Sequence, residues 1–189
     1  MDIAILDAIQ EHLRSPLLDT VMLFATHLGD LALVWLVASA VLIALPRYRR
    51  FGVAVFVAVA VTAALGMLVL KPLFGRARPF VTYEFAGLLI PPPSGDSFPS
   101  NHSMVSFAAA AALCCLPGKG KGLVLVKVAA VLVAGLIAFS RLYLYVHYPT
   151  DILAGAVIGV AVGLASVGVV TRLWPPSATP PGSAGTPSA

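Results

Sequence analysis

The sequence predicts an all-α protein: a polytopic transmembrane helix bundle with about five to six membrane helices and an N-terminal interfacial helix. The 189 residues are 59% hydrophobic and only 11% charged, a composition too apolar for an ordinary soluble domain. Several apolar runs approach the roughly 20 residues that a helix needs to cross a bilayer. The cations behind the net charge of +4 fall into two groups, and neither resembles a nucleic-acid-binding face, so we expect no nucleic-acid partner.

The N-terminal segment, residues 1–14, alternates charged and apolar side chains at helical spacing. Such a pattern favours a helix that lies on the membrane surface rather than one that crosses it. Residues 17–26 are apolar except for Asp19, and the polar stretch 27–30 interrupts them. The sequence leaves open whether residues 17–28 span the membrane, re-enter it or lie on it.

Five apolar segments are the clear membrane crossings of the predicted bundle. They are residues 31–45, 51–70, 103–116, 123–139 and 152–170. Together with the N-terminal segment, they are expected to form one membrane-embedded domain, residues 1–173. The tail, residues 174–189, is rich in Pro, Ser, Gly and Ala, and we expect it to be disordered.

The charges predict how the bundle is oriented in the membrane. One side carries the basic connections 46–50 and 118–122, and in or near its connections are seven basic residues and no acidic one. The other side carries the connection 71–102, the stretch 140–151 and all eight acidic residues. The positive-inside rule makes the first side cytoplasmic, so residues 71–102 and 140–151 are expected to face outward.

The stretch KPLFGRARP, residues 71–79, follows the second crossing and places three cations close together. Pro72 and Pro79 are expected to prevent it from continuing as a regular helix. Taken alone, it is equally well explained as a basic cluster at a membrane boundary. The positive-inside rule, however, predicts few cations on this side of the membrane.

The stretch FPSNHS, residues 98–103, opens the third crossing. Ser100 is a good helix N-cap, and the amides that follow it would point free N–H groups outward. A helix N-terminus attracts anions through these donors and through the helix dipole, and His102 would lie at its mouth. The alternative is simple capping with a bystander histidine.

The stretch SRLYLYVHYPTD, residues 140–151, joins the fourth crossing to the fifth. Pro149 breaks the helix, so a turn could fold Asp151 back to accept the Nδ1–H of His147 and leave Nε2 as a nucleophile. The alternative is an interfacial belt of Tyr, His and Arg side chains. Because the ends of the crossings place all three stretches on one side, they can meet at one site.

Together these stretches resemble the three-part signature of the type 2 phosphatidic acid phosphatase family. The matching patterns are K-x6-R-P (Lys71, Arg78 and Pro79), P-S-x-H (residues 99–102) and S-R-x5-H-x3-D (residues 140–151). The resemblance covers about 80 residues of the chain. One departure is Asn101, which stands where the family usually has glycine and could crowd a bound phosphate or add a donor.

The resemblance implies a membrane lipid phosphatase that forms a phosphohistidine intermediate. His147 would be the nucleophile, Asp151 would hold its imidazole, and His102 would protonate the leaving oxygen and later activate water. The residues implied in phosphate binding are Lys71, Arg78, Ser100, Asn101 and Arg141. No metal or cofactor is expected, because these cations would take the place of a divalent ion. Arg76 is outside the signature and could grip a second phosphate or meet lipid headgroups.

The N-terminal pattern looks like that of small bacterial members of the family that dephosphorylate undecaprenyl diphosphate. We therefore expect this activity in a bacterial cell membrane, with the active site on the extracytoplasmic side. A phosphatidylglycerophosphate or phosphatidate phosphatase would use the same residues and remains the alternative. A vanadium haloperoxidase or a non-enzymatic lipid-phosphate binder fits less well: the chain has no soluble helices added to it, and binding alone would not require both histidines and Asp151.

Overall fold

The computed structural model describes residues 2–175, so residues 176–189 of the expected disordered tail lie outside the described part. The helices are α1 (Asp2–His12), α2 (Pro16–Gly29), α3 (Leu33–Ala44), α4 (Arg49–Ala64), α5 (Lys71–Phe74), α6 (Pro79–Thr82), α7 (Asn101–Cys114), α8 (Lys121–Tyr143) and α9 (Pro149–Leu173). A 3₁₀ turn, η1 (Asp30–Ala32), joins α2 to α3, and a π-helical segment, η2 (Leu65–Leu70), joins α4 to α5. The described residues contain no strand, and the all-α prediction is confirmed.

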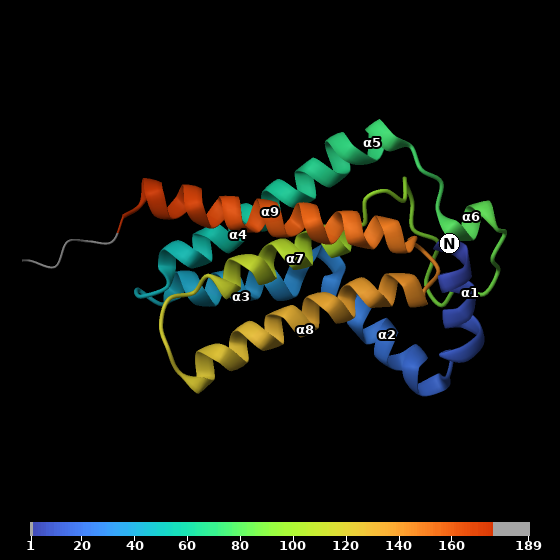
Figure 1. Cartoon of the computed structure of the whole chain (residues 1–189), viewed down its shortest axis with the longest axis horizontal. Coiled ribbons are helices and arrows are strands. Elements are labelled where there is room, and N and C mark those ends of the chain that lie inside the picture. Colours follow the sequence, from blue (N-terminus) through green and yellow to red (C-terminus); the bar gives the residue numbers. More distant parts are fainter. Residues whose placement is uncertain (1, 176–189) are drawn as a thin grey trace, which may run out of the picture.

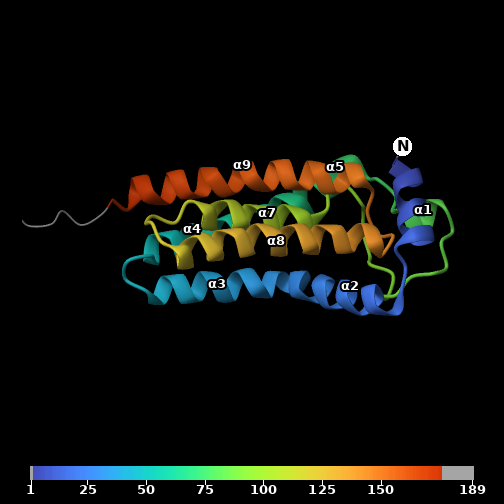
Figure 2. The ribbon, with the colours of Figure 1, turned by 60° about the horizontal axis from the view of Figure 1, so that its bottom comes forward.

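The long helices run along a common axis, and α1 lies across one end of the bundle (Figure 1 and Figure 2). Helix α7 is the central element, because it packs against α4, α8 and α9. Half of its 14 residues are alanine or serine, and most of the helix is buried. A central helix of this kind lets its neighbours approach closely.

Three glycines on α9 set the distance between α9 and α7. They are spaced four residues apart, so they lie on one face of the helix. A Cβ on Gly159 would come within 2.3 Å of the Met104 carbonyl oxygen, and one on Gly163 within 2.3 Å of the Ala108 carbonyl oxygen. This is the small-residue packing that membrane helices use for close contact. It brings the N-termini of α7 and α9 together.

Within residues 2–175, four helical segments are long and apolar enough to cross a membrane: Pro16–Ala44, Arg49–Thr82, Lys121–Tyr143 and Pro149–Leu173. The fifth expected crossing is α7, which has only 14 residues and is covered largely by other helices rather than exposed to lipid. Residues 17–28 belong to the first of these segments. A break at Leu31 and Ala32, both with left-handed backbone conformation, separates α2 from α3.

As expected, residues 71–79 do not continue the second crossing as a regular helix, although Pro72 itself lies inside the helix. The helix passes through η2 and α5 and ends at Gly75, whose φ is +55°. A proline normally clashes with the preceding helical turn and lacks the N–H that the turn requires. The wider π-helical turn of η2, directly before Pro72, changes the hydrogen-bond register and so accommodates the proline.

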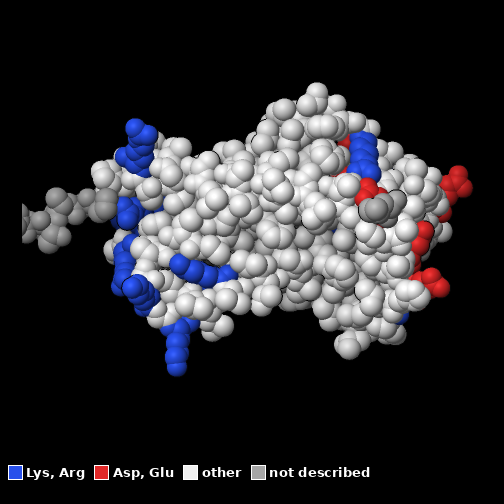
Figure 3. Space-filling model, viewed as in Figure 1, with Lys and Arg blue, Asp and Glu red and all other residues white. Residues whose placement is uncertain are grey.

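The two ends of the bundle differ in charge. Figure 3 shows most of the visible Lys and Arg at one end, a middle belt with almost no charge, and the visible Asp and Glu at the opposite end beside a smaller basic patch. The basic end holds the α3–α4 and α7–α8 connections, which include residues 46–50 and 118–122. The connection 71–102 and the stretch 140–151 lie toward the acidic end, as the sequence predicted.

Candidate active site

A pocket of about 390 Å³ opens near the acidic end of the bundle, and we call it the cationic pocket. It is lined by Met67, Lys71, Pro72, Arg78, Pro93, Ser94, Gly95, Asp96, Asn101, His102, Arg141 and His147. Six of the eight predicted site residues are in this lining. The other two, Ser100 and Asp151, are fully buried behind it. The three sequence stretches therefore meet in space.

Helices α7 and α9 are fastened to each other behind the pocket. The Ser100 amide donates to the carbonyl oxygen of Asp151 over 3.1 Å, and the Ser103 hydroxyl donates to the carbonyl of Ile152 over 2.8 Å. Ser100 also caps α7, since its Oγ accepts from the Ser103 amide, as predicted. These contacts fix the start of α7, and with it His102, relative to Asp151.

His147 lies in the turn between α8 and α9 and is 2% exposed. Its Nδ1 is 3.5 Å from Oδ2 of Asp151, and the Ser97 hydroxyl lies 3.3 Å from the same nitrogen. Ser97 donates to Oδ2 of Asp151 over 2.5 Å, so it lies between the imidazole and the carboxylate. Burial lowers the pKa of His147; Arg141 and Arg78 act in the same direction, against the opposing effect of Asp151. The imidazole is therefore neutral near pH 7.

The three cations of the pocket are held by the protein in different ways. Arg78 is buried, and its Nε and Nη2 donate to the carbonyls of Gly95 and Ser94 over 2.9 and 3.1 Å. Lys71 Nζ donates to the carbonyl of Asp96. The connection after α6 thus forms a wall of the pocket, and the pocket's own cations hold it in place. A phosphate would compete with these carbonyls for the same donors.

Arg141 has donor capacity to spare. Its Nη1 donates to the Thr26 hydroxyl on α2, while its Nε is buried and has no hydrogen-bond partner among the described residues. A buried guanidinium N–H without an acceptor is costly. Arg141 also lines the cationic pocket, so the rest of its guanidinium is available to an anion there.

His102 contacts a carboxylate that the sequence analysis did not select. Its Nε2 is 3.3 Å from Oδ1 of Asp30, whose other oxygen is 2.8 Å from Nδ1 of His27. The backbone at Gly29 packs on the His102 ring, since a Cβ there would come within 2.6 Å of its Cδ2. The break between α2 and α3 therefore shapes the surroundings of His102.

Asn101, the departure from the signature, turns its side chain toward α4 and η2. A Cβ on Gly66 would lie 2.1 Å from the Asn101 Oδ1, so this close contact requires glycine at position 66. The same oxygen is buried and has no donor among the described residues. Asn101 nevertheless lines the cationic pocket.

An apolar groove of about 330 Å³ adjoins the cationic pocket, and we call it the lateral groove. It is lined by Gly29, Leu31, Ala32, Val59, Ala63, Met67, Asn101, His102 and Val105. Met67, Asn101 and His102 belong to both cavities. The pocket that holds the cations thus borders an apolar groove.

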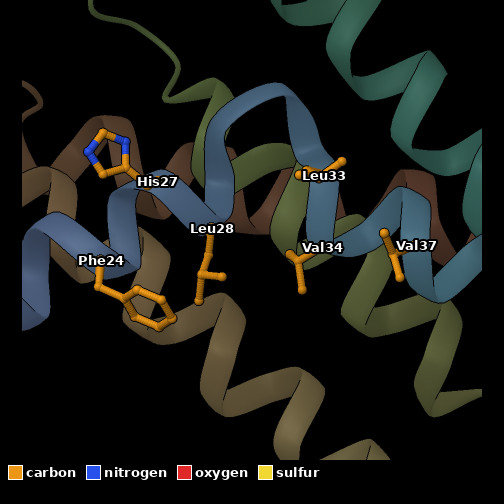
Figure 4. Close-up of a pocket in the computed structure, with 6 residues that line it drawn as sticks. All are labelled: Phe24, His27, Leu28, Leu33, Val34 and Val37. Carbon is orange, nitrogen blue, oxygen red and sulfur yellow. The ribbon is translucent and has the colours of Figure 1, made fainter.

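A second apolar groove, of about 370 Å³, lies at the α2–α3 break. Figure 4 shows its lining side chains, which come from both sides of the break: Phe24, His27, Leu28, Leu33, Val34 and Val37. His27 is the only polar residue among these six. Its polar contact is with Asp30, which in turn contacts His102 of the cationic pocket. This groove is therefore separate from the candidate chemistry.

Two residues near the chemistry were missed by the sequence analysis. Ser97 precedes the FPSNHS stretch and carries no signal of its own. Asp30 did carry one, because an ionisable residue inside a membrane segment suggests function by default. Among residues 2–175, no group of three or more His, Cys, Asp or Glu side chains is arranged to hold a metal ion.

The sequence and the fold of the chain are similar to those of known proteins. Residues 48–175 match the model of the PAP2 superfamily. The chain is 33% identical over 168 residues to decaprenylphosphoryl-5-phosphoribose phosphatase from Mycobacterium tuberculosis, which covers 86% of each chain. It is 29% identical over 150 residues to an undecaprenyl-diphosphatase from Sulfolobus acidocaldarius, covering 79% of this chain and 69% of the relative. The crystal structure of a PAP2-type phosphatidylglycerolphosphate phosphatase from Bacillus subtilis is similar, with a TM-score of 0.74 and 27% identity. The match covers 91% of this chain and 85% of that one.

Proposed function

The chain belongs to the PAP2 superfamily and is an integral membrane lipid phosphatase, and we propose that it removes the terminal phosphate of undecaprenyl diphosphate. The observation that carries the proposal is the junction of two cavities. The cationic pocket suits a phosphate, and the lateral groove that shares Met67, Asn101 and His102 suits an isoprenoid chain. A substrate with a charged head and a long apolar tail fits both at once.

In the proposed reaction, Nε2 of His147 attacks the terminal phosphorus in line with the bridging oxygen. The P–N bond forms as the bridging P–O bond breaks, and undecaprenyl phosphate leaves with a proton from His102. His102 then takes a proton from water, and the hydroxide attacks phosphorus and breaks the P–N bond. Inorganic phosphate leaves, and both histidines return to their starting states.

The cations carry the electrostatic part of the mechanism. Lys71, Arg78 and Arg141 would hold the equatorial oxygens, where charge is spread in the transition state. The presence of all three cations in the lining of the cationic pocket supports this role. Ser100 and the amides around Asn101 would contribute through the N-terminus of α7. We propose that this set suffices without a metal ion.

We further propose that the protein lies in a bacterial cell membrane, with the cationic pocket on the extracytoplasmic side. The basic end of the bundle in Figure 3 supports this orientation, because basic connections remain on the cytoplasmic side. Undecaprenyl diphosphate released on the outer leaflet could then enter sideways through the lateral groove.

A second candidate substrate is decaprenylphosphoryl-5-phosphoribose. The observation in its favour is the match to the phosphatase of that name, which extends over 86% of both chains. The two substrates share a polyprenyl tail and a terminal phosphate, and they differ in the ribose between the tail and that phosphate.

Phosphate release by the purified protein tests these alternatives. The panel is undecaprenyl diphosphate, decaprenylphosphoryl-5-phosphoribose, phosphatidylglycerophosphate and phosphatidate, compared by kcat/KM with and without a chelator. We expect the diphosphate to be the best substrate and the chelator to have no effect. A higher kcat/KM for either glycerolipid would overturn the substrate assignment, and loss of activity in chelator would overturn the mechanism.

A further inference from the structure

Arg76 lies in the KPLFGRARP stretch, yet it is not among the described residues that line the cationic pocket. Its Nη1 donates to Oδ1 of Asp151 over 2.6 Å, and its Nη2 donates to Oδ2 of Asp2 over 3.0 Å. Its guanidinium also lies over the Tyr148 ring, 3.8 Å from the centroid. Arg76 thus bridges a carboxylate of α1 and the carboxylate behind His147.

The bridge is reinforced at Thr150. This hydroxyl accepts from Nη1 of Arg76 over 2.7 Å and donates to Oδ2 of Asp2 over 2.5 Å. Asp2, Arg76 and Thr150 therefore form a closed ring of hydrogen bonds around the start of α9. Helix α1, the first element of the chain, is tied by this ring to the residue next to Asp151.

The two oxygens of Asp151 have separate tasks. Oδ2 accepts from the Ser97 hydroxyl and from the Tyr148 amide, over 2.5 and 2.9 Å, and it faces Nδ1 of His147. Oδ1 accepts from Arg76. Since the carboxylate is fully buried, it requires a compensating cation, and a partner on Oδ1 stops it from rotating.

We propose that Arg76 is a positioning residue: by bridging Asp2 and Asp151, it fixes the carboxylate that orients the His147 imidazole. The inference rests on the proposed function, in which His147 is the nucleophile. It assigns a role in the chemistry to α1, because Asp2 of this helix holds the Nη2 of Arg76. It also replaces the two earlier interpretations of Arg76, a grip on a second phosphate or on lipid headgroups, since both Nη atoms of Arg76 are occupied by protein acceptors.

The test compares Arg76→Ala, Arg76→Lys and Asp2→Asn with the wild type in phosphate release from undecaprenyl diphosphate. We expect Arg76→Ala to lower kcat roughly 10- to 100-fold, the loss typical of residues that orient a functional group from behind, with KM unchanged. Arg76→Lys should recover part of the loss, and Asp2→Asn should lose less than Arg76→Ala. The matched control is Asp7→Asn, because Asp7 also joins α1 to the α8–α9 turn, through the Tyr145 hydroxyl at 2.7 Å. It should retain wild-type kcat.

A second measurement needs no turnover. In protein labelled with ¹⁵N-histidine, the nitrogen shifts of His147 report which ring nitrogen carries the proton. We expect one tautomer, with the proton on Nδ1, in the wild type and a mixture in Arg76→Ala. The inference would be overturned if Arg76→Ala raised KM and left kcat unchanged, or if it changed neither kcat nor the tautomer. Equal losses of kcat in Asp2→Asn and Asp7→Asn would also overturn it. If the wild type releases no phosphate from any lipid but Arg76→Ala still changes the tautomer of His147, the proposed function is overturned and the positioning role of Arg76 stands.

Discussion

Nη1 of Arg78 lies 3.2 Å from Nε2 of His147 and 3.1 Å from the carbonyl oxygen of Val146. A guanidinium can only donate hydrogen bonds, so this contact requires the lone pair of the imidazole to be on Nε2. The ring proton is then on Nδ1, facing Ser97 and Asp151. Arg78 on one side of the ring and Asp151 on the other thus favour the tautomer that a nucleophilic histidine needs before any substrate arrives. A bound phosphate would then draw Arg78 toward its own oxygens.

Trapping the phosphorylated protein should distinguish the roles of His147 and His102. His147→Ala should form no phosphoenzyme, because it lacks the nucleophile. His102→Ala should still be phosphorylated by undecaprenyl diphosphate, because the leaving phosphate is a weak base, but it should hydrolyse the intermediate slowly. Acid quenching followed by mass spectrometry measures the acid-labile phosphate on His147. Equal labelling of the two variants would contradict these roles.

The acid limb of the pH–rate profile should lie below the pH range in which an ordinary histidine titrates. Because burial lowers the pKa of His147, its imidazole stays neutral as the pH falls through 6.5 in the folded protein. We expect kcat/KM for phosphoenzyme formation to remain level there, since this parameter reports the free enzyme. An acid limb centred at or above pH 6.5 would show that the nucleophile has an ordinary pKa.

The same group should make the fold sensitive to acid. The unfolded chain binds a proton at His147 as the pH falls below 6.5, whereas the folded protein does not. The stability contributed by the neutral imidazole is thus complete above pH 6.5 and is lost on acidification, by at most about 1.4 kcal/mol per pH unit. Thermal unfolding of His147→Asn should depend less steeply on pH than that of the wild type.

Asp30 should act on the half-reactions that involve His102. A carboxylate beside an imidazole stabilises its protonated form, which is the form that protonates a leaving group. We expect Asp30→Asn to lower kcat about 10- to 100-fold for phosphatidate, whose leaving alkoxide needs that proton, and less for undecaprenyl diphosphate. His27→Gln is the matched control, since it removes the other partner of Asp30 and leaves His102 untouched. Equal losses in both variants would make Asp30 merely a structural partner of His27.

The convergence of the three stretches could be predicted from the sequence because it depends only on which side of the membrane each crossing ends. The partners of individual side chains could not be predicted in this way. Ser97 is 50 residues from His147 in the chain, and Arg76 is 74 from Asp2, so only the folded chain brings them together. The end of the helix at Gly75 rather than at Pro72 could not be predicted for a related reason: the sequence signals a helix breaker, whereas the π-helical turn that accommodates the proline packs against Asn101 through Gly66.

The close contact of α7 and α9 should control activity from a distance. A Cβ on Gly159 would lie 2.3 Å from the Met104 carbonyl oxygen, so Gly159→Ala must push the two helices apart. We expect a loss of about 1–3 kcal/mol in stability and a lower kcat, because the Ser100–Asp151 contact at the ends of these helices would lengthen. Gly168→Ala is the matched control on the same helix, since a Cβ there would meet nothing within 4 Å. It should retain activity and unfold at the same or a higher temperature, because alanine favours a helix more than glycine does. If Gly159→Ala keeps full activity and the wild-type unfolding temperature, the close packing of these helices does not position the site.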